Sequence, residues 1–204
     1  VGQHPVDQAD AQGLGGVEFP RREQEVERIG QPHELREHPA HAVLGDEAAT
    51  RAFLHDELFG PLGMTSADPR FDTAGTWVAS SYVYATARDF ARFGELYLHD
   101  GVWEGRRILP EGWVEHGRTY CATDPENNTG YGAHWWLPPA LPGSMAAFGY
   151  EGQFTFVVPD RDLVVVRLGK SPVPLGQKVR ESLEELVTAF PVNKARADKS
   201  GTDV

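Results

Sequence analysis

Two apolar runs separated by a short polar turn place the strongest constraint on the fold of this chain. FTFVVP (154–159) and DLVVVRLG (162–169) are joined by an Asp-Arg-Asp turn after Pro159. Aromatic and β-branched residues at this density favour strands, and the turn joins them as an antiparallel hairpin. The second run is apolar from Leu163 to Val166, which is typical of a central strand covered on both faces. GYGAHWWL (130–137) predicts one further strand.

Helical patterns surround the predicted hairpin. Apolar residues at helical period predict four helices, at residues 46–64, 85–101, 108–116 and 174–190. Gly60-Pro61 ends the first helix, and Thr86 begins the second as its N-cap, with Asp89 as the capping-box partner. Pro110 falls in the first turn of the third helix. The last helix carries its apolar residues on one face: Val179, Leu183, Leu186, Val187 and Phe190. The sequence therefore predicts an α+β fold, with an antiparallel sheet packed with helices.

The two ends of the chain differ from its middle. Residues 1–44 hold no Trp or Tyr and a single Phe, so they are expected to be irregular or disordered, as is the polar tail at 191–204. A truncated or out-of-frame start is an alternative explanation of the first segment. His38 and His41 are spaced to share a metal, but no motif places a third ligand, so a solvated segment is the preferred interpretation. The folded part is predicted at 45–190.

Composition excludes several classes of function. The net charge of −11 and a pI of about 5.1 argue against a nucleic-acid-binding surface, which needs clustered Lys and Arg. Cys121 is the one cysteine, so neither an intrachain disulfide nor a cysteine metal site can form. No apolar run approaches the roughly 20 residues of a membrane span, and no signal-like start is present, so the chain as written is expected to be cytoplasmic. No motif indicates a cofactor or a metal.

Several stretches, in the same order along the chain, resemble the serine β-lactamase-like hydrolases. The stretches are FLHDELFGPLGM, YATARDFARFGELYLHDGVWEGRRILPEGWV, GYGAHWW and FGYEGQFTFVVPDRDLVVVRLG. The family includes class C β-lactamases, DD-peptidases, related esterases and 6-aminohexanoate-dimer hydrolase. The resemblance covers roughly residues 45–190 and implies the C-terminal part of a β-lactamase-like fold.

The resemblance also implies a chemistry that this chain lacks the residues to perform. Such enzymes transfer an acyl group from a small-molecule substrate to a serine in a Ser-x-x-Lys motif, assisted by a Tyr-x-Asn-type motif. None of the seven serines precedes a Lys by three positions, and no Tyr precedes an Asn by two. We therefore expect the C-terminal portion of a serine hydrolase that is inactive alone, and the resemblance leaves export of the parent enzyme open. The alternative is a noncatalytic binding or assembly module on the same scaffold.

The stretch GYEGQ stands where the resemblance places the third motif of these hydrolases, which is Lys- or His-x-Gly. Tyr150 or Glu151 occupies the Lys or His position, the register being open by one residue. Gly152 is then the close-approach glycine, and the backbone N–H of Gln153 is half of an oxyanion hole. The alternative is a plain glycine turn entering a strand, which needs glycine for its backbone freedom alone. The sequence leaves both interpretations open.

Other candidate residues have weaker support. Ser80 and Ser81 are possible nucleophiles, but no His lies at a spacing that marks it as their base, and a solvated turn is preferred. Trp135 and Trp136 are adjacent strand residues that point to opposite faces, so at most one of them lines an acyl pocket. Two lone histidines with no partner motif remain: His116 and His134.

Overall fold

The computed structural model describes residues 46–72, 77, 81–126 and 128–193. All of them belong to one compact unit, Pro39–Val204, and the other unit, Val1–His38, lies outside the described residues. The helical elements are α3 (Glu47–Leu54), the π-helical η3 (His55–Phe59), α4 (Ala87–Leu98), α5 (Trp113–Arg118), the 3₁₀ turns η4 (Pro159–Arg161) and η5 (Val173–Leu175), and α6 (Gly176–Thr188). The strands are β1 (Asp68–Pro69), β2 (Val83–Tyr84), β3 (Val102–Trp103), β4 (Arg106–Arg107), β5 (Ala122–Asp124), β6 (Thr129–Tyr131), β7 (Trp136–Leu137), β8 (Met145–Gly149), β9 (Gln153–Val158) and β10 (Leu163–Arg167).

A six-stranded antiparallel sheet forms the centre of the described unit. Its strand order is β10-β9-β8-β7-β6-β5, so each strand pairs with its neighbour in sequence. The predicted hairpin is confirmed as β9 and β10, with Val164 opposite Val157. The turn between them is η4, and Asp162 closes it in the left-handed region with φ 53°. The predicted α+β class, with an antiparallel sheet packed with helices, is confirmed.

The position of β10 differs from the prediction in one respect. Both of its faces are covered, because Val164 packs in the cluster beside α4 while Leu163 and Val165 pack in the cluster that contains Val187 of α6. Among the described residues, however, β10 pairs only with β9 and is the last strand of the sheet, so the second neighbour expected of a central strand is not among them. Each of its five residues is half-buried, whereas Phe154–Val158 of the neighbouring strand are buried.

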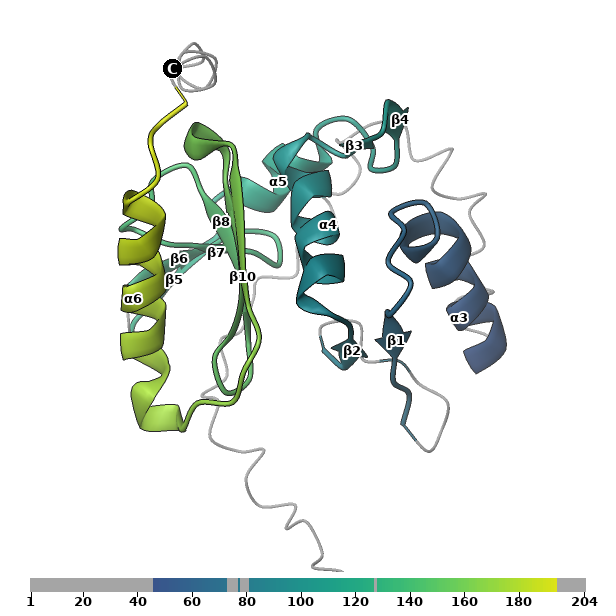
Figure 1. Cartoon of the computed structure of the whole chain (residues 1–204), viewed down its shortest axis with the longest axis horizontal. Coiled ribbons are helices and arrows are strands. Elements are labelled where there is room, and N and C mark those ends of the chain that lie inside the picture. Colours follow the sequence, from purple (N-terminus) through teal and green to yellow (C-terminus); the bar gives the residue numbers. More distant parts are fainter. Residues whose placement is uncertain (1–45, 73–76, 78–80, 127, 194–204) are drawn as a thin grey trace, which may run out of the picture. The chain divides into compact units, whose positions relative to one another are not determined.

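Two helices cover the opposite faces of the sheet. Figure 1 shows α6 on one side of β10 and α4 on the other. On the α6 side, Phe154 and Phe156 form the centre of an apolar cluster with Val187. On the α4 side, Trp135 stacks on Phe93 with ring centroids 6.1 Å apart. α3 and η3 supply a third cluster, packed against α4 through Leu96.

Alternation places the two adjacent tryptophans on opposite faces. Trp135 is buried in the cluster beside α4, whereas Trp136 stacks on Phe148 in the cluster beneath α6. The single strand predicted at 130–137 is two short strands, β6 and β7. His134 has φ 65° in the turn between them, and the N–H of Gly132 donates to the carbonyl of Trp135 at 2.8 Å, which bends the chain back on itself.

The start of α4 uses a hydrogen-bond arrangement that the sequence pattern predicted only in part. Thr86 is the N-cap and its Oγ1 accepts from the N–H of Asp89, as predicted. The reciprocal hydrogen bond of a capping box, from the N–H of Thr86 to the Asp89 side chain, is absent, because this N–H donates to Ser66 Oγ at 2.9 Å instead. Ser66 Oγ in turn donates to the Asp89 carboxylate at 2.5 Å. A serine 20 residues upstream thus links the cap to the carboxylate.

The other helices form where they were predicted, with α4 and α6 two or three residues shorter at their ends, and one helix starts at a different place. α3 continues into η3 and ends before Gly60, as the Gly60-Pro61 step predicted. The third predicted helix starts later than expected, because α5 begins at Trp113 after Gly112. Pro110 therefore lies before the helix, where its carbonyl accepts from the N–H of Trp113 at 3.2 Å. No helix in the described ranges is long and apolar enough to span a bilayer.

Candidate functional site

The predicted third-motif residues form the loop between β8 and β9. Gly149 pairs with Gln153 at the end of the two strands, so Tyr150, Glu151 and Gly152 make a three-residue connection. Glu151 has φ 58° and Gly152 has φ 84°, both in the left-handed region. Glycine adopts this conformation without steric cost, and this backbone requirement accounts for one role of Gly152.

Gly152 is also a point of close approach, but the group that approaches it is a side chain of the protein. Gly152 is buried, and a Cβ at this position would lie 2.9 Å from Nη1 of Arg167 and 3.5 Å from Cβ of Ser171. The positive φ therefore favours glycine at this position, and a Cβ would in addition displace the end of the Arg167 side chain. The role predicted for it toward a substrate stays a prediction.

Arg167, at the end of β10, fixes the loop from below. Its guanidinium donates to the carbonyl of Gly152, to the carbonyl of Gly169 at 2.8 Å and to Ser171 Oγ at 2.8 Å. Ser171 also donates its backbone N–H to the carbonyl of Glu151 at 2.8 Å. The segment that follows β10 and the candidate loop are thus held together by charge-assisted and backbone hydrogen bonds.

The Gln153 side chain reinforces this connection. Its Nε2 donates to the carbonyl of Gly169 at 2.8 Å, and its Oε1 accepts from the N–H of Gly169 at 2.9 Å. The side-chain amide therefore satisfies both backbone groups of Gly169, as a residue of a neighbouring antiparallel strand would. The sequence interpretation considered only the backbone N–H of Gln153, and it missed this side-chain role because Gly169 lies 16 residues away.

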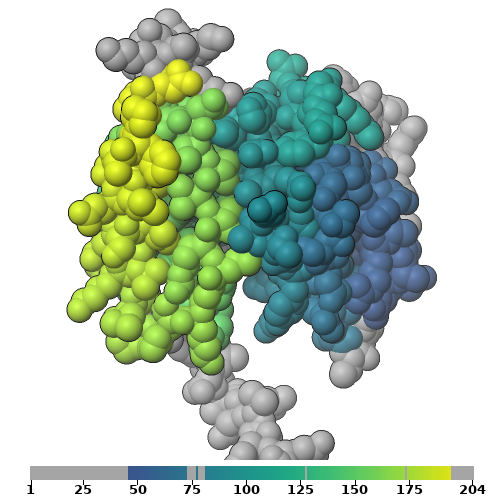
Figure 2. Space-filling view, viewed as in Figure 1, coloured from purple at the N-terminus to yellow at the C-terminus, as the bar shows by residue number. Residues whose placement is uncertain are grey.

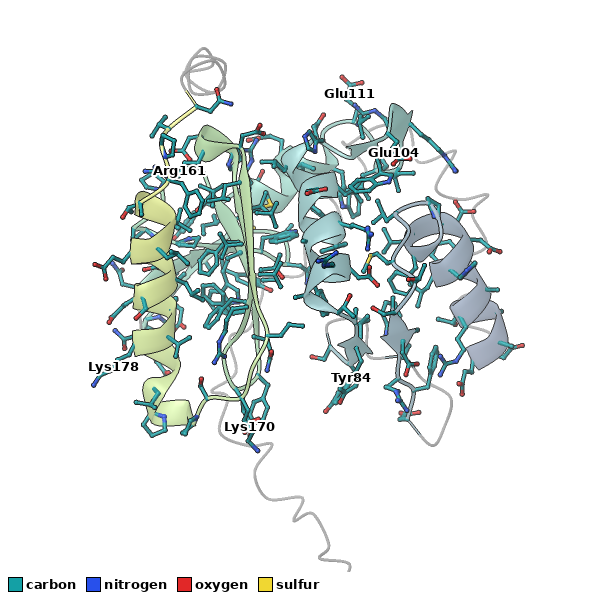
Figure 3. All side chains as sticks on the ribbon, in the orientation of Figure 1. Tyr84, Glu104, Glu111, Arg161, Lys170 and Lys178 are labelled. Atoms are coloured by element: carbon teal, nitrogen blue, oxygen red, sulfur yellow. The ribbon has the colours of Figure 1, made fainter. Side chains whose placement is uncertain are left out.

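Tyr150 and Glu151, the two alternatives for the Lys or His position, differ in their surroundings. The Tyr150 side chain is 80% exposed. Glu151 is half-buried, and its carboxylate lies 3.4 Å from Nζ of Lys170. Figure 3 shows Lys170 beyond one end of β10 and Arg161 beyond the other, so the candidate loop lies at the Lys170 end of the sheet. The register between the two alternatives stays open.

The remaining sequence candidates that fall within the described ranges lie on other elements. Ser81 is exposed, and Ser80, His38 and His41 lie outside the described residues. His134 is exposed in the turn between β6 and β7, and His116 lies on α5 beside Trp113, with ring centroids 6.2 Å apart. Within the described residues, no hydrogen bond or ion pair joins Ser81 to a base, so we assign it no chemistry. No group of three potential metal ligands occurs within the described ranges.

Asp89 is a buried carboxylate that the sequence interpretation treated only as a helix cap. It accepts from the N–H and the hydroxyl of Ser66, at 2.8 and 2.5 Å, and from the Arg92 guanidinium. Burial alone would raise the pKa of Asp89, but the hydrogen bonds from Ser66 and the nearby Arg92 outweigh it and hold the pKa below its ordinary value. The arrangement keeps a charged carboxylate in place at the start of α4.

A second buried charge pair lies under α6. Nε of Arg180 is 3.6 Å from the Glu184 carboxylate, Nη1 donates to Thr129 Oγ1 at 2.9 Å, and the guanidinium lies over the Phe148 ring at 5.7 Å. Burial raises the pKa of Glu184, and Arg180 offsets only part of this shift. The pair links α6 to β6 and β8 and contains none of the predicted site residues.

One shallow hollow of about 360 Å³ lies between α4 and the β3–β4 hairpin. Its lining residues are Glu95, His99, Val102, Trp103, Glu104 and Gly105. None of these belongs to the candidate loop or to the segment that holds it, so the hollow does not extend the predicted site.

Comparison with known proteins identifies the family. A family model for beta-lactamases matches residues 34–189. The chain belongs to the beta-lactamase family. A 6-aminohexanoate-dimer hydrolase of Paenarthrobacter ureafaciens is 34% identical over 114 residues, which cover 50% of this chain and 29% of that enzyme.

Solved structures of beta-lactamase-like proteins agree with the fold. One from Bacillus anthracis, which carries the name of a 6-aminohexanoate-dimer hydrolase, superposes with a TM-score of 0.54 at 24% identity and covers 68% of this chain and 38% of its own. A beta-lactamase from Mycobacterium bovis superposes with a TM-score of 0.50 at 17% identity and covers 70% of this chain and 59% of its own. This beta-lactamase-family chain therefore spans less than two thirds of the length of each of these proteins.

Proposed function

We propose that the folded part of this chain is the C-terminal portion of a serine hydrolase and that the chain does not perform acyl transfer by itself. The parent reaction would transfer the acyl group of a small amide, ester or β-lactam to a serine. The observation that carries the proposal is the absence from the sequence of any serine in a Ser-x-x-Lys motif and of any Tyr-x-Asn motif. Membership of the beta-lactamase family supports the class of reaction.

The geometry of the candidate loop also leads us to expect no acyl transfer by the chain alone. Acyl transfer needs a nucleophile, a base within hydrogen-bond reach of it and donors aimed at the developing oxyanion. The loop offers a solvent-exposed Tyr150 and a Glu151 beside Lys170, and the Gly152 carbonyl is bound to Arg167. At most the backbone N–H of Gln153 would serve as an oxyanion donor. Removal of the nucleophile from a serine protease costs about a millionfold in turnover, and half an oxyanion hole would leave less.

The proposal is tested by incubating the purified chain with a chromogenic ester and a fluorescent penicillin and recording intact mass. The Paenarthrobacter ureafaciens hydrolase, purified and assayed with the ester in the same way, is the control for protein handling and for the reagents. We expect no mass increase and no hydrolysis above the rate in buffer. A stable adduct on any serine would refute the proposal, and peptide mapping of the adduct would identify the nucleophile.

A noncatalytic binding or assembly module on the beta-lactamase scaffold is the second candidate function. Exposed aromatic side chains favour it, namely Tyr82, Tyr84 and Tyr150, which are 59%, 60% and 80% exposed. The coding sequence immediately upstream separates the two candidates. A Ser-x-x-Lys motif there, in the same or another frame, favours the hydrolase portion, whereas its absence over several hundred codons favours the module.

A further inference from the structure

The hollow between the end of α4 and the β3–β4 hairpin has a lining suited to a cation. Its volume of about 360 Å³ falls within the range of about 300–1,000 Å³ that is usual for small-molecule sites. Two carboxylates, an imidazole and an indole line it, from Glu95, Glu104, His99 and Trp103. Figure 2 shows the teal segment that includes α4 and the hairpin at the surface. In Figure 3, Glu104 lies toward the Arg161 end of β10, away from Lys170, so the hollow is separate from the candidate loop.

The backbone fixes the walls of the hollow. The end of α4 is closed by a hydrogen bond from the N–H of Gly101 to the carbonyl of Leu96, at 2.7 Å. In the hairpin, Glu104 and Gly105 have φ 47° and 80°, and two consecutive residues with positive φ form the tight turn that matches the twist of the strands. Trp103 is half-buried because it packs against the cluster around Leu96. The carboxylate of Glu104 and the indole are therefore held on a short, defined hairpin.

The negative charge of the hollow is not compensated within the part of the chain that the structure describes. Neither Glu95 nor Glu104 forms a side-chain hydrogen bond or an ion pair there. The nearby Arg107 is engaged elsewhere, with Asp100 at 3.6 Å and with the carbonyl of Leu109 at 3.2 Å. The last turn of α4 contains no basic residue, although the C-terminal end of a helix carries a partial negative charge that favours a cation.

His99 and Trp103 indicate which kind of cation fits. Nδ1 of His99 lies 2.9 Å from the carbonyl of Glu95, which can only accept, so Nδ1 carries the hydrogen and Nε2 of the neutral ring is an acceptor. The carboxylates are acceptors as well, and a primary ammonium has three N–H groups to donate. An indole attracts an ammonium over its face and covers the apolar stem that carries it. A primary ammonium on an alkyl chain satisfies all of these groups.

We propose that this hollow binds a primary alkylammonium group. The ammonium lies between the carboxylates of Glu95 and Glu104, and the alkyl stem lies against Trp103. The inference does not depend on the proposed function, because none of these residues belongs to the candidate loop. Exposed ion pairs and cation–π contacts each contribute little, so we expect a dissociation constant of about 1 mM.

The test is an NMR titration of the ¹⁵N-labelled 204-residue chain with n-butylammonium chloride at constant ionic strength. We expect saturable shifts of the Trp103 indole N–H and of backbone amides in residues 95–105, and none at Gly152. The neutral n-butanol and tetramethylammonium, which has no N–H, should bind at least about threefold more weakly. Glu95→Gln and Glu104→Gln should each weaken binding about two- to fivefold, whereas Glu111→Gln, at an exposed position before α5, should not. An otherwise unchanged spectrum shows that each variant is folded.

Three results would overturn the proposal. The first is a set of shifts that does not saturate or that sodium chloride reproduces, which would indicate charge screening only. The second is equal binding of n-butanol, and the third is unchanged affinity in both glutamine variants. Nα-acetyl-lysine methylamide distinguishes two sources of the ammonium. Its binding at the same residues would assign the hollow to lysine side chains of a partner protein, and binding of n-butylammonium alone would assign it to small free amines, both of which support an ammonium site.

Discussion

Gly94 allows α4 to lie directly on the sheet, and its replacement by Ala should destabilise the protein. A Cβ at Gly94 would lie 2.6 Å from Val164 Cγ1 and 3.3 Å from Thr155 Cγ2. Alanine in place of glycine within a helix gains about 0.5–1 kcal/mol from backbone entropy. Overpacking of this kind costs about 1–3 kcal/mol, because the β-branched Val164 cannot move aside. The net expectation is a loss of roughly 1 kcal/mol in the free energy of unfolding.

The matched control is Gly176→Ala, at the first residue of α6. A Cβ there would have no atom within 4 Å apart from those of its chain neighbours and its own helix backbone. This substitution keeps the helix-propensity gain without the collision, so it should stabilise the protein by up to about 1 kcal/mol. The assay is urea unfolding of the purified chain, followed by circular dichroism and by tryptophan fluorescence.

The double variant Gly94→Ala with Val164→Ala isolates the collision. Val164→Ala removes two methyl groups and should cost about 1.5–3 kcal/mol on its own. In that background Gly94→Ala should be neutral or stabilising, which gives a coupling free energy of about 1–3 kcal/mol. Equal stabilisation by Gly94→Ala and Gly176→Ala, or additive effects within about 0.5 kcal/mol in the double variant, would refute the packing argument.

Three further predictions concern the charged groups. Asp89→Asn should lower the free energy of unfolding by about 1–3 kcal/mol at pH 7. Because the pKa of Asp89 is lowered in the folded protein, the stability that its charge contributes is lost as the pH falls below about 4, and urea unfolding should then give wild type and variant the same stability. The pKa of Glu184 is raised in the folded protein, so its charged form disfavours folding, and Glu184→Gln should leave the free energy of unfolding unchanged or raise it at pH 7. The difference in stability between variant and wild type should narrow as the pH falls toward about 4, and a loss of stability that is the same at both pH values would contradict this. Arg167→Met should speed amide exchange at Gly152 and cost about 1–3 kcal/mol, whereas Arg106→Met on the exposed β3–β4 hairpin should change neither, and equal effects of the two would count against the role of Arg167.

The sequence predicted the elements whose cause is local. Alternating and continuous apolar runs identified β9 and β10, and helical periodicity with a Thr N-cap identified α4. One local signal was misleading, because Pro110 suggested that a helix starts there, whereas α5 starts at Trp113.

Features that depend on distant residues were not predicted. Ser66 completes the cap of α4 from 20 residues away, and Gln153 pairs with Gly169 across 16 residues. No periodicity marks such contacts, because they depend on which segments the fold brings together. The same reason explains β10: its sequence describes the environment of a strand with two neighbours, whereas the described residues supply one.

For the candidate loop, the sequence predicted the position of a motif but not the residues that hold it in place. The resemblance placed GYEGQ where the third motif belongs, with a plain glycine turn as the alternative, and the structure puts this stretch in the β8–β9 connection with a buried Gly152. The contacts that fix it come from Arg167, Gly169 and Ser171, which the sequence interpretation did not name. These contacts explain the glycine physically, and the functional roles of Tyr150 and Glu151 still await a test.

Acylation of the isolated chain is the measurement that bears most directly on its function. The purified 204-residue protein is incubated with a fluorescent penicillin and with an activated ester, and its intact mass is recorded over time. If the chain is a hydrolase portion without a nucleophile, its mass stays unchanged and the reagents decay at the rate seen in buffer. A stoichiometric acyl adduct on a serine would contradict the account and would place a working active site within this chain.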